Sequence, residues 1–299
     1  MLFRSLVQTF LSRALEALYR AESVAGNAKA AAALAEDALR EANPQFSGPL
    51  VANSGTLVDA RLWLGDIGGA QKALAMAEDY LKRASQSRNA SSFGDLWAAG
   101  VEARRASLLA ETGRHAEAEQ AARKALMLQE RAVPRYDEMA ANSPVAMFPR
   151  GQMERLAENW RGMVAQALRA QGRLVEAEVE ARRVLLNLLA RAGRYTPDSA
   201  KAIMLLSSVL FEQGRFAEAE TLAKAAVDTY ESVGSGPGSY QLANALNLVA
   251  KTQTARERWR EARATFDRLA GQIAIDDASR DAFVSGNVML GLVQVKTGA

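Results

Sequence analysis

The chain has 299 residues, of which 49% are hydrophobic and 24% are charged, ordinary shares for a soluble fold. It contains no cysteine and a single histidine, which excludes a disulfide framework, a thiolate metal site and cysteine–histidine or serine–histidine–aspartate catalysis. The net charge is only +3 and the basic residues are scattered among acidic ones, so we expect no nucleic-acid partner. We also expect no catalytic residues, no cofactor and no metal.

The N-terminus begins with a mostly apolar stretch, residues 1–7. Arg13 and Glu16 interrupt the apolar residues before the core of a secretory signal could form. We therefore expect this segment to be the first helix of a cytoplasmic protein. A periplasmic protein whose signal was removed is the alternative. No run of residues reaches the length of a membrane span.

A short string of residues recurs along the chain. It consists of a glycine, a bulky residue two positions later, an alanine three positions further on, and small or apolar residues after a further four and three positions. The strongest copies begin at Gly113, Gly172 and Gly214. Internal repetition of this kind predicts units that stack on one another and do not fold around one core.

Weaker copies extend the series in both directions. Upstream copies begin at Gly26 and Gly65; downstream, Glu257 stands where the glycine belongs, and Gly298 falls in phase near the end. The last three intervals, from 172 to 214, from 214 to 257 and from 257 to 298, are 42, 43 and 41 residues long. We expect about six and a half units, forming a single solenoid over residues 1–299.

Each copy predicts two antiparallel α-helices joined by a tight turn. The glycine supplies the left-handed conformation that ends the first helix, and the bulky residue after it, His115 in one copy, packs into the seam between the helices. Nearby acids such as Glu117 and Glu119 are expected on exposed helix surface. The alanine five positions after the glycine lets the second helix approach closely. These alanines are Ala118, Ala177, Ala219 and Ala262.

The interval from Gly113 to Gly172 is the longest, and residues 127–158 hold an insert. Its 59 residues exceed the 42 of the next interval by 17. Prolines at 134, 144 and 149 rule out one continuous helix through the insert, yet Tyr136 and Phe148 are too apolar for a free linker. Two interpretations stay open: a helix extension with a loop packed on its own solenoid, or a flap over the groove or a docking surface.

Residues 284–299 predict a terminal helix with apolar residues at helical spacing. Gly291 and Gly298 are both in repeat phase, so we expect a truncated seventh repeat and a chain that continues past Ala299. The alternative is that this helix caps the solenoid.

The repeated string resembles the tetratricopeptide repeat. Its long period is similar to the repeats of kinesin light chain and of bacterial proteins joined to a caspase-like CHAT protease. The stretch Leu246 to Ala250, followed by Trp259 to Leu269, carries most of the resemblance. The resemblance implies an all-α, right-handed α-α superhelix that binds a protein or peptide. It is specific for the fold and says little about the ligand.

In this family the first helix of each repeat lines a concave face, and an asparagine there often holds a peptide main chain. Asn247 matches that asparagine, and Asn244 and Lys251 lie on the same helix stripe. Amides can clamp an extended backbone, and cations attract a carboxylate, although polar residues are also ordinary on a solvated face. The candidate site residues on this face are Asn159, Gln166, Arg169, Lys201, Ser208, Asn244, Asn247 and Lys251.

We therefore expect a non-catalytic scaffold that binds a protein or peptide, as the recognition module of a larger bacterial protein. One alternative is a peptide sensor in which the bound peptide changes the pitch of the superhelix. Another is the N-terminal part of a CHAT-type cysteine protease whose catalytic domain lies downstream. The sequence leaves the partner and the oligomeric state open.

Overall fold

The computed structural model describes residues 11–12, 14–22, 27–86, 94–141, 152–235, 239–272 and 293–297. All regular secondary structure in these ranges is helical, and they contain no strand. The chain divides into two compact units: Met1–Ser23 with Asn27–Ala167, and Val24–Gly26 with Leu168–Ala299. The expectation of one solenoid over residues 1–299 stays a prediction.

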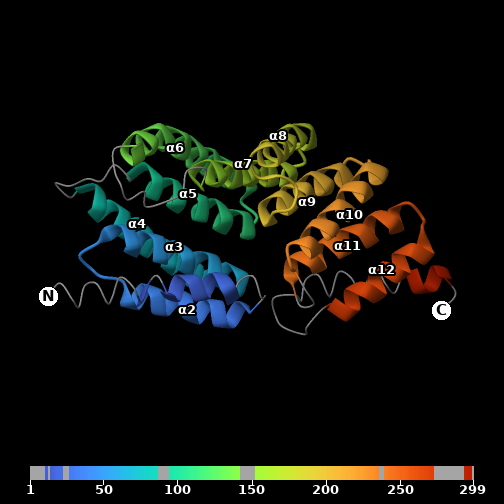
Figure 1. Cartoon of the computed structure of the whole chain (residues 1–299), viewed down its shortest axis with the longest axis horizontal. Helices are drawn as coiled ribbons and strands as arrows, with labels where there is room; N and C mark the ends of the chain where they lie inside the picture. Colours follow the sequence, from blue (N-terminus) through green and yellow to red (C-terminus); the bar gives the residue numbers. More distant parts are fainter. Residues whose placement is uncertain are drawn as a thin grey trace. The chain divides into compact units, whose positions relative to one another are not determined.

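The first unit consists of helices that follow one another as antiparallel neighbours (Figure 1). α2 packs on α3, α3 on α4, and α5 on α6, while α5 also contacts both α3 and α4. The boundary between the units falls near the C-terminal end of α7 (Gln152–Ala170). The other helices of this unit are α2 (Ala28–Glu41), α3 (Ser47–Trp63), α4 (Ile67–Gln86), α5 (Gly94–Glu111) and α6 (His115–Ala141).

The second unit repeats this arrangement. Each helix from α8 to α12 packs on the next, and α9 also contacts α11, so the first helices of successive hairpins touch. The same relation holds for α3 and α5 in the first unit. These stacked hairpins confirm the predicted all-α repeat fold. The helices are α8 (Leu174–Ala192), α9 (Pro197–Glu212), α10 (Phe216–Ser232), α11 (Tyr240–Ala255) and α12 (Trp259–Gln272).

The predicted turn glycines occupy equivalent bends. Gly65, Gly113, Gly172 and Gly214 each end a first helix with φ of 72°, 76°, 74° and 78°, the left-handed region that a Cβ disfavours. The prediction that these glycines make the hairpin turns is therefore confirmed where the structure describes them. The other two predicted turn positions, 26 and 298, lie outside the described residues.

The turn at Glu257 has the same geometry without a glycine. Glu257 has φ 58° and is the one non-glycine residue with positive φ in the described part of the chain. The Glu257 N–H donates to the Thr254 carbonyl at 3.0 Å, and the Arg258 N–H donates to the Gln253 carbonyl at 2.9 Å. This is the paired hydrogen-bond pattern of a Schellman motif, which satisfies the last carbonyls of the helix. The repeat geometry therefore holds Glu257 in the left-handed conformation that glycine usually adopts at this turn.

Replacing Glu257 with glycine should raise the free energy of unfolding by about 1 kcal/mol, because the left-handed conformation is strained for any residue with a Cβ. The matched opposite change, Gly214→Ala, should lower it by a similar amount, since no neighbouring atom crowds that position and only φ is at issue. Urea unfolding of both variants measures the two effects. If both variants have the same free energy of unfolding as the wild type, the left-handed φ does not affect the stability of these turns.

The predicted close-packing alanines are buried, as expected. Ala118, Ala177, Ala219 and Ala262 have at most 2% of their surface exposed. His115 is half-buried at the seam position. Glu117 is exposed as expected, but Glu119 is buried and pairs with Arg123 on the same helix, so the expectation was wrong for Glu119.

Helix α6 continues into the predicted insert and ends at Ala141. It passes through Pro134, so this proline does not break the helix, although it cannot donate to the carbonyl four residues before it. Ala132 and Tyr136 are buried on either side of Pro134, and this apolar packing accounts for the continued helix. The rest of the insert, residues 142–151, lies outside the described residues.

Of the predicted terminal helix 284–299, the structure describes residues 293–297, which are helical, with Val293 fully buried. The choice between a cap and a truncated repeat stays a prediction. No helix in the described ranges is both long enough and apolar enough to pass through a lipid bilayer.

Candidate functional site

The predicted site residues fall into two sets. Asn159 and Gln166 are exposed on α7 and belong to the first unit. The other six belong to the second unit, and five of them lie on α9 and α11, which contact each other. We call these five the first-helix face: Lys201, Ser208, Asn244, Asn247 and Lys251.

Arg169, the sixth residue of that set, already has an ion-pair partner. Its Nη1 lies 2.5 Å from Glu212 Oε1 at the end of α9, and both side chains are partly exposed. This pair joins α7 to α9 and uses the charge that a ligand carboxylate would need. Arg169 is therefore a connector between helices, and we leave it out of the candidate site.

Both helices of the first-helix face, α9 and α11, begin at a residue whose side chain caps the helix N-terminus. Thr196 Oγ1 accepts from the Ser199 N–H at 3.1 Å, with Pro197 at the first helical position, and starts α9. Ser239 Oγ accepts from the Leu242 N–H at 3.3 Å and starts α11. These caps set the helix starts, and the three- and four-residue spacing then places Asn244, Asn247 and Lys251 on one side of α11.

Asn247 has an unsatisfied amide oxygen. The residue is only 7% exposed, and its Oδ1 has no hydrogen-bond partner among the described residues. An unpaired buried acceptor of this kind costs about 1–3 kcal/mol. Buried polar groups are normally satisfied, so this position calls for an explanation that packing does not supply.

Lys251 stands four residues further along α11. It is half-buried, and burial lowers the pKa of its ammonium group. No described acid forms an ion pair with it, whereas Lys124 pairs with Glu102 and Lys224 with Glu220. A cation that is partly removed from water without an anion is unfavourable by itself. The first-helix face thus carries an unsatisfied acceptor and an unpaired cation side by side on one helix.

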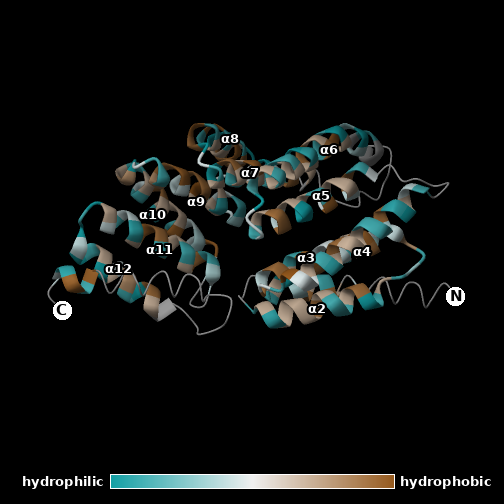
Figure 2. Ribbon diagram, turned by 180° about the vertical axis from the view of Figure 1, so that it is seen from behind, coloured by the Kyte–Doolittle hydropathy of each residue, from teal (hydrophilic) through white to brown (hydrophobic). Residues whose placement is uncertain are grey.

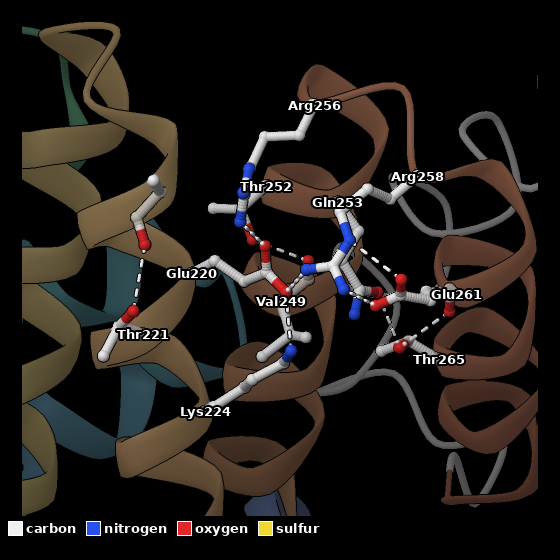
Figure 3. Close-up of polar contacts among 11 residues, drawn as sticks. Glu220, Thr221, Lys224, Val249, Thr252, Gln253, Arg256, Arg258, Glu261 and Thr265 are labelled. Carbon is white, nitrogen blue, oxygen red and sulfur yellow. Dashed lines mark hydrogen bonds and ion pairs between the residues drawn. The ribbon is translucent and has the colours of Figure 1, made fainter.

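A buried carboxylate on α10 holds α11 and α12 in place (Figure 3). Only 3% of the Glu220 side chain is exposed, and it accepts from Lys224 Nζ at 2.6 Å, Arg256 Nη1 at 2.5 Å and Arg258 Nη1 at 2.8 Å. Burial alone would raise the pKa of Glu220, but the hydrogen bonds from Lys224 and Arg256 outweigh it and lower the pKa. The two arginines flank the turn after α11, so Glu220 ties that turn to the preceding hairpin.

The same arrangement occurs one repeat earlier at Glu178. This carboxylate accepts from Gln213 Nε2 at 2.9 Å and from Arg215 Nη1 at 2.8 Å, on either side of Gly214, and from Arg182 on its own helix. Burial opposes ionisation, but these three donors lower the pKa of Glu178 to about 2. A glutamate just after the close-packing alanine therefore fixes the next hairpin turn in both repeats.

Sequence reasoning missed a polar cluster in the first unit. Arg104 on α5 donates from Nε and Nη2 to Asp59 Oδ2 at 3.2 and 2.9 Å, and from Nη1 to the Gly100 carbonyl at 3.2 Å. A Cβ on Gly55 of α3 would lie 3.2 Å from the Arg104 side chain, a tight contact from which the arginine would have to shift slightly. The arginine also lies 5.9 Å from the Trp160 ring centroid. The sequence signal for this cluster was a glycine inside each of two predicted helices, Gly55 and Gly100, with Arg104 one turn after Gly100.

Metal binding has no candidate in the described ranges, where no group of three or more His, Asp or Glu side chains could hold an ion.

The repeats match known family models. One model described as tetratricopeptide repeat matches residues 198–270, and a second with the same description matches residues 103–131. Both matches span a hairpin turn that ends at a left-handed glycine, Gly214 or Gly113. These two segments are therefore tetratricopeptide repeats. A search of curated protein sequences found no significant match.

Solved structures share the tetratricopeptide-repeat fold at low identity. A Rap protein complexed with competence and sporulation factor is 14% identical, with a TM-score of 0.58 over 98% of this chain and 73% of that one. BtubC (BKLC) from P. vanneervenii is 17% identical, with a TM-score of 0.56 over 83% of this chain and 89% of that one. A STAND protein with a tetratricopeptide repeat sensor from Pyrococcus horikoshii is 13% identical, with a TM-score of 0.58 over 97% of this chain and 41% of that one. At such identities these likenesses concern the fold alone.

Proposed function

We propose that the first-helix face binds an extended peptide segment of a partner protein and that the chain acts as a non-catalytic scaffold. The observation that carries the proposal is the pairing of Asn247, whose buried Oδ1 lacks a partner, with Lys251, a half-buried cation without an ion pair among the described residues. Both groups would gain the interactions that they lack if a peptide covered the face.

The chemistry of the ligand follows from these two side chains. An extended peptide presents an N–H and a carbonyl at every residue, and a turn of the Asn247 amide would let it accept from one and donate to the other. Lys251 would pair with a carboxylate of the peptide, and because the lysine is half-buried this pair would be screened less than one on open surface. Lys201 and Ser208 on α9 would add polar contacts along the same face.

Similar folds support a binding role. The Rap protein that shares this fold was solved with competence and sporulation factor bound, and the Pyrococcus horikoshii protein uses its repeats as a sensor. A peptide-sensing role for this chain stays a prediction within the same proposal. The association with a CHAT-type protease also stays a prediction.

A displayed library of random peptides, selected on the whole chain, provides the ligands for a test. We expect enriched peptides to carry an aspartate or glutamate. Lys251→Glu should weaken their binding at least about tenfold by repulsion, and Asn247→Ala should weaken it severalfold by loss of backbone hydrogen bonds. Fluorescence anisotropy with the selected peptides measures both effects.

The matched control is Arg260→Glu, which makes the same charge reversal at an exposed position of α12 away from the face. It should leave peptide affinity unchanged. Failure to enrich any peptide, or equal affinity of all three variants, would remove the first-helix face as the binding site.

A further inference from the structure

Helix α8 presents an apolar stripe on its outer side. Val175, Val179 and Leu186 are 75%, 59% and 66% exposed, and their spacing of four and seven residues places them on one face. The opposite side of α8 is fully used in the core, where Ala177, Ala181, Val184 and Leu188 are buried. Figure 2 shows brown, hydrophobic residues along α8. We call Val175, Val179, Leu186 and the two arginines between them the outer α8 face.

This stripe is unusual within the described residues. Other exposed large apolar side chains occur singly on their helices or loops, apart from the pair Leu11 and Leu18 near the N-terminus. Single exposed apolar residues need no explanation, but a run along one helix face marks an interaction surface. The stripe is not needed to join α8 to the next hairpin, because α8 already packs against α9.

The charges on the outer α8 face are positive. Arg182 and Arg183 lie between Val179 and Leu186, and Arg183 is exposed without an ion pair among the described residues. The three glutamates of α8 are not free: Glu176 pairs with Arg173, Glu178 pairs with Arg182 and Arg215, and Glu180 also has a partner. A partner that covers the valines and leucine therefore meets one unpaired cation, Arg183, with no free acid beside it.

We propose that the outer α8 face docks an amphipathic helix of a partner protein that carries acidic residues along the edge of its apolar stripe. A narrow stripe with helical spacing is what a second helix packs against. A second copy of this chain fits poorly, because antiparallel pairing about this point would bring the two unpaired Arg183 side chains together. A membrane surface also fits poorly, since the face lacks aromatic residues and offers only Arg183 as a cation without an ion pair among the described residues.

A synthetic helix tests this directly. The probe is a fluorescein-labelled, lactam-stapled peptide of about 20 residues with leucines along one face and glutamates on both edges. Matched peptides carry lysines in place of the glutamates, or serines in place of the leucines. We expect the glutamate peptide to bind the whole chain, Val179→Asp to weaken it at least about tenfold, and Arg183→Glu to shift preference to the lysine peptide. Fluorescence anisotropy reads out binding, and circular dichroism checks that each variant keeps its helices.

Other outcomes overturn the proposal. They are no binding of the glutamate peptide, equal binding of all three peptides, or an affinity that Val179→Asp leaves unchanged. Self-association that Val179→Asp abolishes would assign the face to a second copy, and Val179-dependent binding to phosphatidylglycerol vesicles would assign it to a membrane. Lys251→Glu should not alter binding of the helical probe, which keeps this surface distinct from the first-helix face.

Discussion

Replacing Glu220 with alanine should lower the free energy of unfolding by about 3 kcal/mol. The carboxylate is buried and accepts from Lys224, Arg256 and Arg258, so its removal leaves three cations without their shared anion. The loss falls at the low end of the range for broken buried pairs, because these cations are 36–50% exposed and can regain water. Urea denaturation of the wild type and the variant, with equal slopes, would give the difference.

Two further variants separate charge from shape at this position. Glu220→Gln keeps the side-chain volume and removes only the charge, so it should lose most of the same stability. Glu261→Gln removes the other partner of Arg258, which is an exposed ion pair, and should change stability little. If Glu220→Ala and Glu261→Gln unfold at the same urea concentration, Glu220 does not hold the hairpins together.

The turns were predictable because their cause is local. A hairpin that closes with a Schellman motif needs a left-handed residue at one position, and glycine is the residue that adopts this conformation without strain. Gly113 and Gly214 therefore mark the turn from sequence alone. Ala219 was predictable for a similar reason, since two helix backbones approach closely only at small side chains. Glu257 shows the limit: the register of the repeat, not the residue type, identified that turn.

The links between hairpins were not predictable from local rules. Glu178 and Arg215 are 37 positions apart, and their contact depends on how one hairpin stacks on the next. A glutamate on a helix is more often a solvated charge, so nothing in its own neighbourhood indicates burial. A signal nevertheless exists in the register. Glu178 and Glu220 stand at the same repeat position, and an arginine follows the next turn residue in both cases.

The sequence predicted which helix carries the candidate site residues, but not which of their polar atoms lack a partner. Repeat register placed Asn247 and Lys251 on the first helix of a hairpin, and the structure puts both on one side of α11. Whether the amide oxygen of Asn247 has a partner depends on side chains of the neighbouring helices, which the register does not specify. The helix through Pro134 shows the same limit: the rule that proline ends a helix is local, and packing around Tyr136 overrides it.

Replacing Ala219 with leucine should lower the free energy of unfolding by about 2–3 kcal/mol through overpacking. Ala219 is fully buried between α9 and α10, and its carbonyl accepts from Ser207 Oγ of α9 at 2.7 Å. The helix backbones are therefore so close at this point that a larger side chain must push them apart and break that hydrogen bond. The loss should appear as a lower urea midpoint with an unchanged slope.

Ala217→Leu provides the matched control, because Ala217 is an exposed residue two positions earlier on the same helix. The same gain in volume there meets solvent, and leucine is nearly as good a helix former as alanine, so stability should stay within about 0.5 kcal/mol. The contrast between the two positions tests close hairpin packing directly. If both variants unfold at the wild-type midpoint, α9 and α10 do not meet at Ala219, and the alanine of the repeated string has no packing role.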